Sequence, residues 1–160
     1  MSRLTRTGVV DLLVPAVVVG VLAYLLLHRY WADLPRLQYT AALPLGVLAV
    51  IELVMARRVR AAVRHDPDAK PMAAIAIARL VALGKASSLV GAGLLGAVIA
   101  LEVRVLPDAG SVDAARHDSR VGFVLIGTCA LLLAAGLLLE RAGIDPGGTG
   151  DQNQPPVVQR

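Results

Sequence analysis

Five ionisable residues interrupt or border the long apolar runs of this 160-residue chain: Asp11, Glu52, Arg79, Lys85 and Glu140. Arg141 follows the last of them directly. A charge at the centre of a membrane helix costs about 2.5–3.5 kcal/mol, so charged residues inside such runs call for partners. We therefore expect three acids from three helices to meet two bases from a fourth helix at similar depth. These five residues and Arg141 are called the charge cluster below.

Two interpretations of the charge cluster stay open. In the first, it is an inter-helix network that fixes packing and register, helped by basic side chains that extend to the lipid headgroups. In the second, it is a polar pocket that binds a proton, an ion or an anionic substrate from the cytoplasm. An enzyme acting on lipid would need an acid–base pair at headgroup level, and Glu140 with Lys85 is the pair that could serve.

Catalytic and metal-binding patterns find little support in the sequence. His28, His65 and His117 fall in three different predicted loops, and Cys129 is the single cysteine. Asp113 and His117 are four residues apart and could share a helix face, but most metal sites need three or four ligands. We expect no catalytic residues, no metal and no cofactor, and predict that the protein is not an enzyme.

The elements that carry these residues are predicted from hydropathy. Hydrophobic residues make up 56% of the chain and charged residues 18%, whereas soluble domains average about 45–50% and about 25%. Four apolar runs are long enough to cross a hydrocarbon core of about 30 Å: residues 9–27, 37–56, 82–101 and 121–139. We predict an all-α, integral membrane four-helix bundle over residues 1–142, with the third helix beginning near residue 72. Residues 143–160, rich in Gly, Pro, Gln and Asn, are predicted to form a disordered cytoplasmic tail.

Basic residues and aromatic residues predict the same orientation. The side rich in lysine and arginine is expected to be cytoplasmic, and it carries Arg3, Arg6, Arg57, Arg58, Arg60, Arg64, Lys70, Arg141 and Arg160. The other side carries Arg29, Arg36, Arg104, Arg116 and Arg120. Near the predicted outer ends of the spans lie Tyr24, Tyr30, Trp31, Tyr39 and Phe123, where interfacial aromatic residues are common. Both termini are therefore predicted to be cytoplasmic.

Small residues recur every four positions in the third span: Gly84, Ser88, Ala92, Gly96 and Ala100. Such stripes let membrane helices approach closely, because lipid provides no hydrophobic drive for helix association. We expect this helix-packing stripe to make the third span the central helix. Lys85 lies about 100° around the helix from Gly84, so it can point between neighbouring helices.

The expected partners follow from the placement of charge. The net charge is +4, but the basic residues flank apolar runs and no nucleic-acid-binding motif is present. We expect the lipid bilayer and anionic lipid headgroups as partners, no nucleic acid, and a second copy or another membrane protein as the interacting chain. The predicted location is the cell membrane, as a multi-pass protein.

Three segments resemble an actinobacterial family of small four-pass membrane proteins of unknown function, often encoded near folate-biosynthesis genes. They are ARLVALGKASSLVGAGLLG, the DSR before the fourth span, and the closing LLLER. The matching positions are Arg79, Lys85, Ala86, Ser87, Gly91, Asp118, Arg120, Glu140 and Arg141. The resemblance covers roughly residues 5 to 142. It implies a four-span architecture and a plasma-membrane location, and it provides no catalytic residues.

The function expected from these observations is that of a non-enzymatic interaction or assembly partner in the plasma membrane, with a charge network at its cytoplasmic side. The alternative is a small, oligomeric transporter or ion-coupled carrier that uses Glu52, Lys85 and Glu140. Four spans are few for a carrier, so dimerisation would be needed to enclose a path.

Overall fold

A computed structural model describes residues 8–30, 38–64 and 72–143. These residues form four long helices: α1 (Val9–Tyr30), α2 (Ala42–Val63), α3 (Ala74–Val105) and α4 (Asp113–Ala142). One-turn 3-10 helices, η2 (Tyr39–Ala41) and η3 (Leu106–Asp108), precede α2 and follow α3. The described segments contain no strand, and all four helices are long and apolar enough to cross a membrane. The predicted all-α class with four candidate spans is confirmed. The predicted tail lies outside the described residues from position 144 onward.

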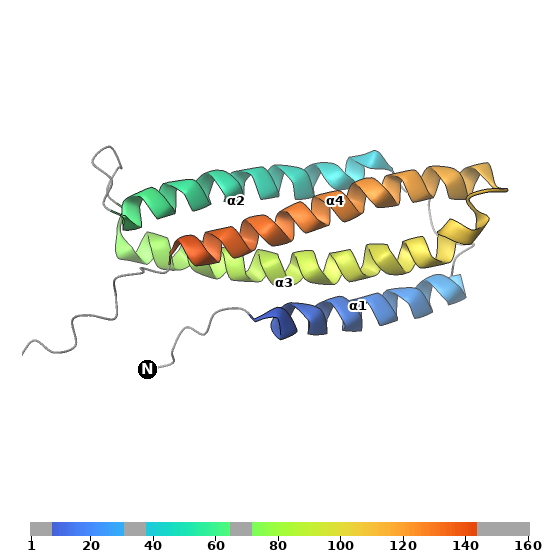
Figure 1. Cartoon of the computed structure of the whole chain (residues 1–160), viewed down its shortest axis with the longest axis horizontal. Helices are drawn as coiled ribbons and strands as arrows, with labels where there is room; N and C mark the ends of the chain where they lie inside the picture. The colour runs from blue at the N-terminus through green and yellow to red at the C-terminus, as the bar shows by residue number, and fades with distance from the viewer. Residues whose placement is uncertain (1–7, 31–37, 65–71, 144–160) are drawn as a thin grey trace, which may run out of the picture.

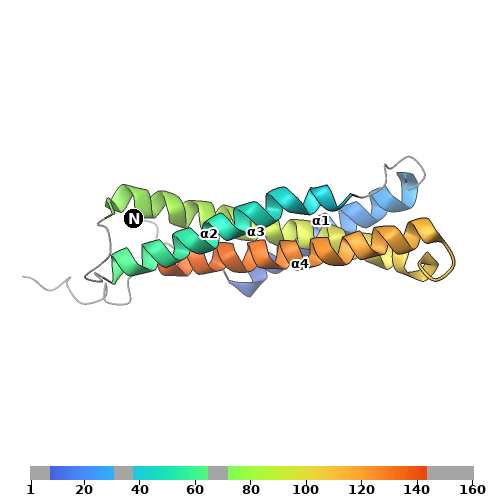
Figure 2. The same cartoon turned by 90° about the horizontal axis from the view of Figure 1, so that it is seen from above.

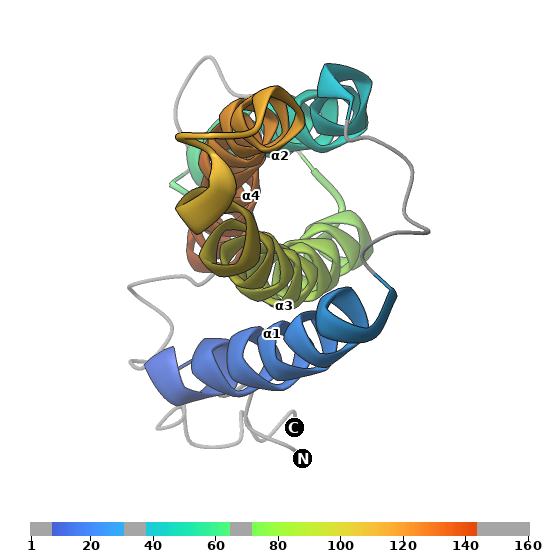
Figure 3. The ribbon, with the colours of Figure 1, turned by 90° about the vertical axis from the view of Figure 1, so that its right-hand side faces the viewer.

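The helices lie side by side in the order α1, α3, α4, α2 (Figures 1 and 2). Within the described chain, α1 packs against α3 alone, whereas α2 packs mainly against α4 and touches α3 only slightly. Figure 3 shows this end-on, with α1 on the far side of α3 from α2 and α4. Neighbours α1 and α3 run parallel, as do α2 and α4, while α3 and α4 are antiparallel.

The two ends of the molecule differ in composition. The basic end holds the exposed arginines Arg57, Arg58, Arg60, Arg64 and Arg141, where α2 and α4 finish and α3 starts. The aromatic end holds Tyr24, Tyr30, Tyr39 and Phe123. These names are used below for the two ends.

Local sequence explains where the helices begin. Pro44 is the third residue of α2, where the missing N–H would have had no partner within the helix. Asp113 opens α4, so its negative charge faces the positive end of the helix dipole. The 32 residues of α3 span about 48 Å at 1.5 Å per residue, more than the hydrocarbon core of about 30 Å. Helices therefore extend beyond the apolar runs from which the spans were predicted.

Buried residues form a separate group at each level of the molecule. At the basic end, α2, α3 and α4 converge on a core made of Ala56, Val59, Leu139 and Ala142, with Met72, Ile77 and Leu80 against it. Half-way along, α2 and α4 bury Ala49, Leu132 and Ala135 against each other. At the aromatic end, α1 contributes Leu27 to a group that also contains Leu101, Val105 and Ala115. Each group contains at least one alanine, whose small side chain lets the helix axes come close together.

Candidate functional site

The crossing of α3 and α4 is built on glycine. A methyl group at Gly84 would lie 2.7 Å from the carbonyl oxygen of Gly136, and one at Gly136 would lie 2.6 Å from the carbonyl oxygen of Gly84. Ser88, one turn along α3, is fully buried, and its backbone also lies against Gly136. Its hydroxyl donates to the carbonyl oxygen of Lys85 at 2.9 Å, so this polar group is satisfied within its own helix.

The helix-packing stripe does not face one neighbour throughout. Each four-residue step turns by about 40°, so the face rotates by about 160° between residues 84 and 100. Gly84 and Ser88 face α4, whereas Gly96 faces α1, where a methyl group would overlap the carbonyl oxygen of Ala16. Ala92 and Ala100 are buried along the same path. The winding of the stripe allows α3 to pack closely against both α4 and α1.

Glu52 is the most deeply buried member of the charge cluster. Its exposed fraction is 0%, and it lies near the middle of α2, between the buried residues Ala49 and Ala56. Its carboxylate faces the hydroxyl of Ser87 on α3. Neither carboxylate oxygen has a hydrogen bond of good geometry within the described segments. This is one of the few places where α2 approaches α3, and a carboxylate occupies it.

Lys85 and Glu140 lie at the same level on facing helices. The backbone nitrogen of Glu140 packs against Gly84, the neighbour of Lys85. The side chain of Glu140 is buried, with 6% exposed, and that of Lys85 is half-buried. Among the described residues, no ion pair joins Lys85 to Glu52.

The remaining members of the charge cluster are at the surface. Arg79 and Arg141 are exposed near the basic end. Asp11 is also exposed, and its carboxylate accepts a hydrogen bond from the backbone nitrogen of Gly8 at 2.9 Å. Because α1 contacts neither α2 nor α4 in the described chain, the structure does not bring Asp11 against the other two acids.

A second buried carboxylate lies at the aromatic end. Glu102 on α3 is 6% exposed, and its Oε2 accepts a hydrogen bond from the Ser119 hydroxyl on α4 at 2.9 Å. Its other oxygen lies directly over Gly122, where any side chain would overlap it. Asp118 is 8% exposed beside this pair. In the described part of the chain, Glu102 Oε1 and Asp118 Oδ1 have no hydrogen-bond partner.

This second carboxylate was not recognised in the sequence, and the reason is local. Glu102 and Asp118 both fall between the third and fourth apolar runs, in the predicted loop that contains His117. The structure corrects that expectation, because α4 already begins at Asp113, eight residues before the predicted span at residue 121. The useful signal was Gly122, whose lack of a side chain leaves room for a carboxylate from α3.

The residues considered for metal binding have other contacts. The ring of His117 packs edge-on against Tyr39, with centroids 5.7 Å apart, and Asp113 pairs with Arg116 at 3.2 Å. Cys129 is buried in α4. In the described segments, no group of three or more His, Cys, Asp or Glu side chains is arranged to hold a metal.

Four apolar helices with carboxylates in their interfaces define a candidate multi-pass membrane protein. Its buried carboxylates lie on α2, α3 and α4. The chain belongs to the protein family of unknown function DUF3180, whose family model matches residues 12–146. No curated protein and no solved structure matches the chain.

Proposed function

We propose that this protein is a non-enzymatic plasma-membrane protein that acts as an assembly partner for other membrane helices. Both termini and the basic end face the cytoplasm in this proposal. The exposed Arg57, Arg58, Arg60 and Arg64 support that orientation, because positively charged loops are retained on the cytoplasmic side. An actinobacterial origin and a location of the gene beside folate-biosynthesis genes stay expectations from the resemblance.

The observation that carries the proposal is the one-sided packing of α1. The helix contacts only α3 within the described chain, and most of its surface is exposed and apolar. Opposite its contact with Gly96 lie Val14, Val18, Val21 and Leu25, each more than half exposed. Four helices in a row leave two terminal helices, so a further helix can be added beside α1 without disturbing the other three.

Crosslinking through α1 tests this proposal. Val18→Cys is placed in a Cys129→Ala background, so that the introduced thiol is the only one in the chain. The matched control is Val90→Cys on α3, which is exposed to a similar extent. We expect oxidative crosslinks from position 18, either to a second copy or to a copurified membrane protein, and none from position 90. A mass in native detergent equal to one 16.7 kDa chain, without crosslinks or copurifying partner, would contradict the proposal.

A second candidate function, a proton- or ion-coupled carrier, is favoured by Glu52. An acidic side chain inside a membrane bundle is a functional candidate by default, because its burial is costly. Glu52 is fully buried in α2 without a hydrogen-bond partner in the described chain, so packing alone does not explain why an acid is present there. A proton or a cation bound at the carboxylate would compensate its charge.

Proton flux in liposomes distinguishes the two candidates. The purified protein is reconstituted into liposomes that enclose a pH-sensitive dye. A potassium diffusion potential, negative inside, is then imposed to drive protons inward. A carrier is expected to acidify the interior faster than empty liposomes, and Glu52→Gln is expected to abolish this flux while the folded protein accumulates normally. Lys85→Ala should act in the same way if the lysine belongs to the path. Equal flux in empty and wild-type liposomes would exclude proton coupling.

A further inference from the structure

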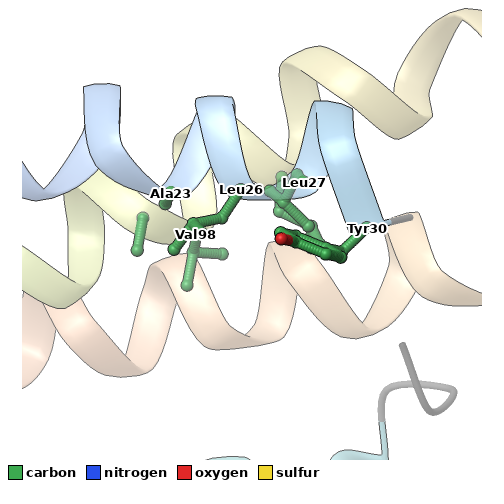
Figure 4. A pocket seen from close by; sticks show the side chains of 7 residues that line it. Ala23, Leu26, Leu27, Tyr30 and Val98 are labelled. Atoms are coloured by element: carbon green, nitrogen blue, oxygen red, sulfur yellow. The ribbon is translucent and has the colours of Figure 1, made fainter. Parts of the chain in front are cut away.

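An apolar groove runs between α1 and α3 toward the aromatic end. Its volume is about 460 Å³, and it is lined by Ala23, Leu26, Leu27, Tyr30, Ala97, Val98 and Leu101. Apart from the Tyr30 hydroxyl, the lining side chains carry no polar atom. Figure 4 shows the ring of Tyr30 reaching along the groove toward Leu27. Alanines at positions 23 and 97 leave the space that larger side chains would fill.

Two arginines and one aspartate lie at one end of this groove. Arg29 is exposed in the last turn of α1, one residue before Tyr30. Arg104 is in the last turn of α3, and its side chain is 33% exposed while it pairs with Asp108 at 3.2 Å. Both helices that border the groove therefore carry an arginine at the same end. An apolar groove with arginines at one end is complementary to an amphiphile with an apolar chain and an anionic head group.

The length of the groove distinguishes an acyl chain from a helix. On α1, the lining residues extend from position 23 to position 30, which is about 10 Å at 1.5 Å per residue. One leaflet of the hydrocarbon core is about 15 Å deep, half of about 30 Å. A transmembrane partner helix would cross both leaflets, whereas the groove is shorter than one leaflet is deep, as expected for a site that holds part of one lipid chain.

We infer that this groove binds one acyl chain of an anionic phospholipid, whose phosphate lies beside Arg29 and Arg104. The inference goes beyond the proposed assembly role, since it concerns the side of α1 that is already paired with α3. The bound chain fills the space between the two helices, and the phosphate adds a contact to each of them. The lipid thereby strengthens an interface in which α1 has no other described neighbour.

Native mass spectrometry tests the inference with the full chain. The protein is purified in detergent and titrated with phosphatidylglycerol or with phosphatidylcholine carrying the same acyl chains. The wild-type protein is expected to retain more phosphatidylglycerol than phosphatidylcholine. One arginine near a membrane surface contributes roughly 1 kcal/mol to anionic-lipid binding, so Arg29→Gln is expected to weaken phosphatidylglycerol binding about five-fold. Its effect on phosphatidylcholine should be small.

Filling the groove separates the acyl-chain contact from the charge. Ala97→Phe is expected to abolish specific retention of both lipids, because its ring occupies the space of the chain. Val98→Phe, at the rim of the same groove, provides the measurement if the first variant does not accumulate. Wild-type lipid retention in a folded groove-filling variant would overturn the inference.

The matched control is a second apolar groove, between α2 and α4. It has a volume of about 590 Å³ and is lined by residues that include Val47, Val50, Val124 and Leu131. Arg120, one turn before Val124, provides a cation from α4, whereas the described start of α2 has no basic residue. Arg120→Gln is therefore expected to leave the lipid preference unchanged. The inference is wrong if the preference disappears with Arg120→Gln and persists with Arg29→Gln, or if wild type shows no preference.

Discussion

Gly84 on α3 and Gly136 on α4 face each other with no side chain between their backbones, and a methyl group on either would come within 2.7 Å of the other's carbonyl oxygen. This contact holds the two central helices of the row together at the level of Glu140 and Lys85. In lipid, such close approach gives packing and carbonyl contacts that larger residues would prevent. The position of the acidic and basic residues at this level therefore depends on glycine.

A methyl group at this crossing is expected to destabilise the protein. Gly136→Ala and Gly84→Ala each force the backbones of α3 and α4 apart, since the new carbon would meet main-chain atoms that cannot rotate away. Overpacking of this kind costs about 1–3 kcal/mol. The measurement is the free energy of unfolding in mixed micelles, obtained by titration with a denaturing detergent and followed by circular dichroism.

Gly127 is the matched control for the crossing glycines. It also lies within α4, but a methyl group there would have no neighbour within 4 Å. Alanine is favoured over glycine in a helix by about 1 kcal/mol, so Gly127→Ala should be neutral or stabilising. Equal stability of the Gly136→Ala and Gly127→Ala proteins would show that α3 and α4 do not approach as described.

At the α1–α3 interface, two introduced cysteines are expected to form a disulfide. A Cβ at Gly93 would lie 3.8 Å from the Cβ of Val19, within the range of about 3.5–4.5 Å for bridged cysteines. Val19→Cys with Gly93→Cys, in a Cys129→Ala background, should form an intramolecular disulfide that alkylation and mass analysis detect. Val18→Cys with Gly93→Cys is the control, since Val18 points away from α3. An equal yield from both pairs would contradict the described orientation of α1.

Apolar runs were sufficient to predict the four helices, but they could not predict where the helices end. The run assigned to the fourth span starts at Val121, yet α4 starts at Asp113 and already carries Asp118 and Ser119 in its interfaces. Polar residues such as these can be helical outside lipid, where hydropathy gives no signal. The helical residues that the prediction missed therefore lie mostly in polar segments, which are not hydrophobic enough to be recognised as part of a span.

The pairing of helices depends on shape, which a single sequence does not display. The stripe on α3 predicted a close-packing face. It did not predict that the two halves of this face pack against different helices. In the same way, Glu52 could be selected because it interrupts an apolar run. Glu102 and Glu140 each follow directly after a run, so this position alone does not distinguish them. The burial of Glu102 becomes evident only when Ser119 and Gly122 are seen on the facing helix. Asp11 was included in the charge cluster by depth alone, and α1 is too far from α2 for contact.

The hydrogen bond between Ser119 and Glu102 is expected to stabilise the aromatic end. Ser119→Ala removes the hydroxyl that donates to Glu102 Oε2 at 2.9 Å, and this buried oxygen then has no hydrogen bond from Ser119. Loss of one partner of a buried polar pair costs about 1–3 kcal/mol. In a double-mutant cycle with Glu102→Leu, which cannot accept the bond, the two substitutions should couple by at least about 0.5 kcal/mol. Ser111→Ala, at an exposed serine, should change stability by no more than about 0.5 kcal/mol. Strictly additive effects at positions 102 and 119 would mean that the bond contributes nothing.

Replacement of Glu52 by an apolar residue of similar size distinguishes a structural carboxylate from a functional one. Because the side chain is fully buried without a hydrogen-bond partner in the described chain, Glu52→Met should leave the free energy of unfolding unchanged or increase it. Ser87→Ala, which removes the facing hydroxyl, reports whether the two groups support each other. If Glu52 and Ser87 do not stabilise each other, Ser87→Ala should change the free energy of unfolding of the wild-type protein and of the Glu52→Met protein equally. A loss of more than about 3 kcal/mol in Glu52→Met would instead indicate a buried charge pair broken by the substitution, as the network interpretation requires. A stable Glu52→Met protein that has lost proton flux would assign the carboxylate to the carrier function.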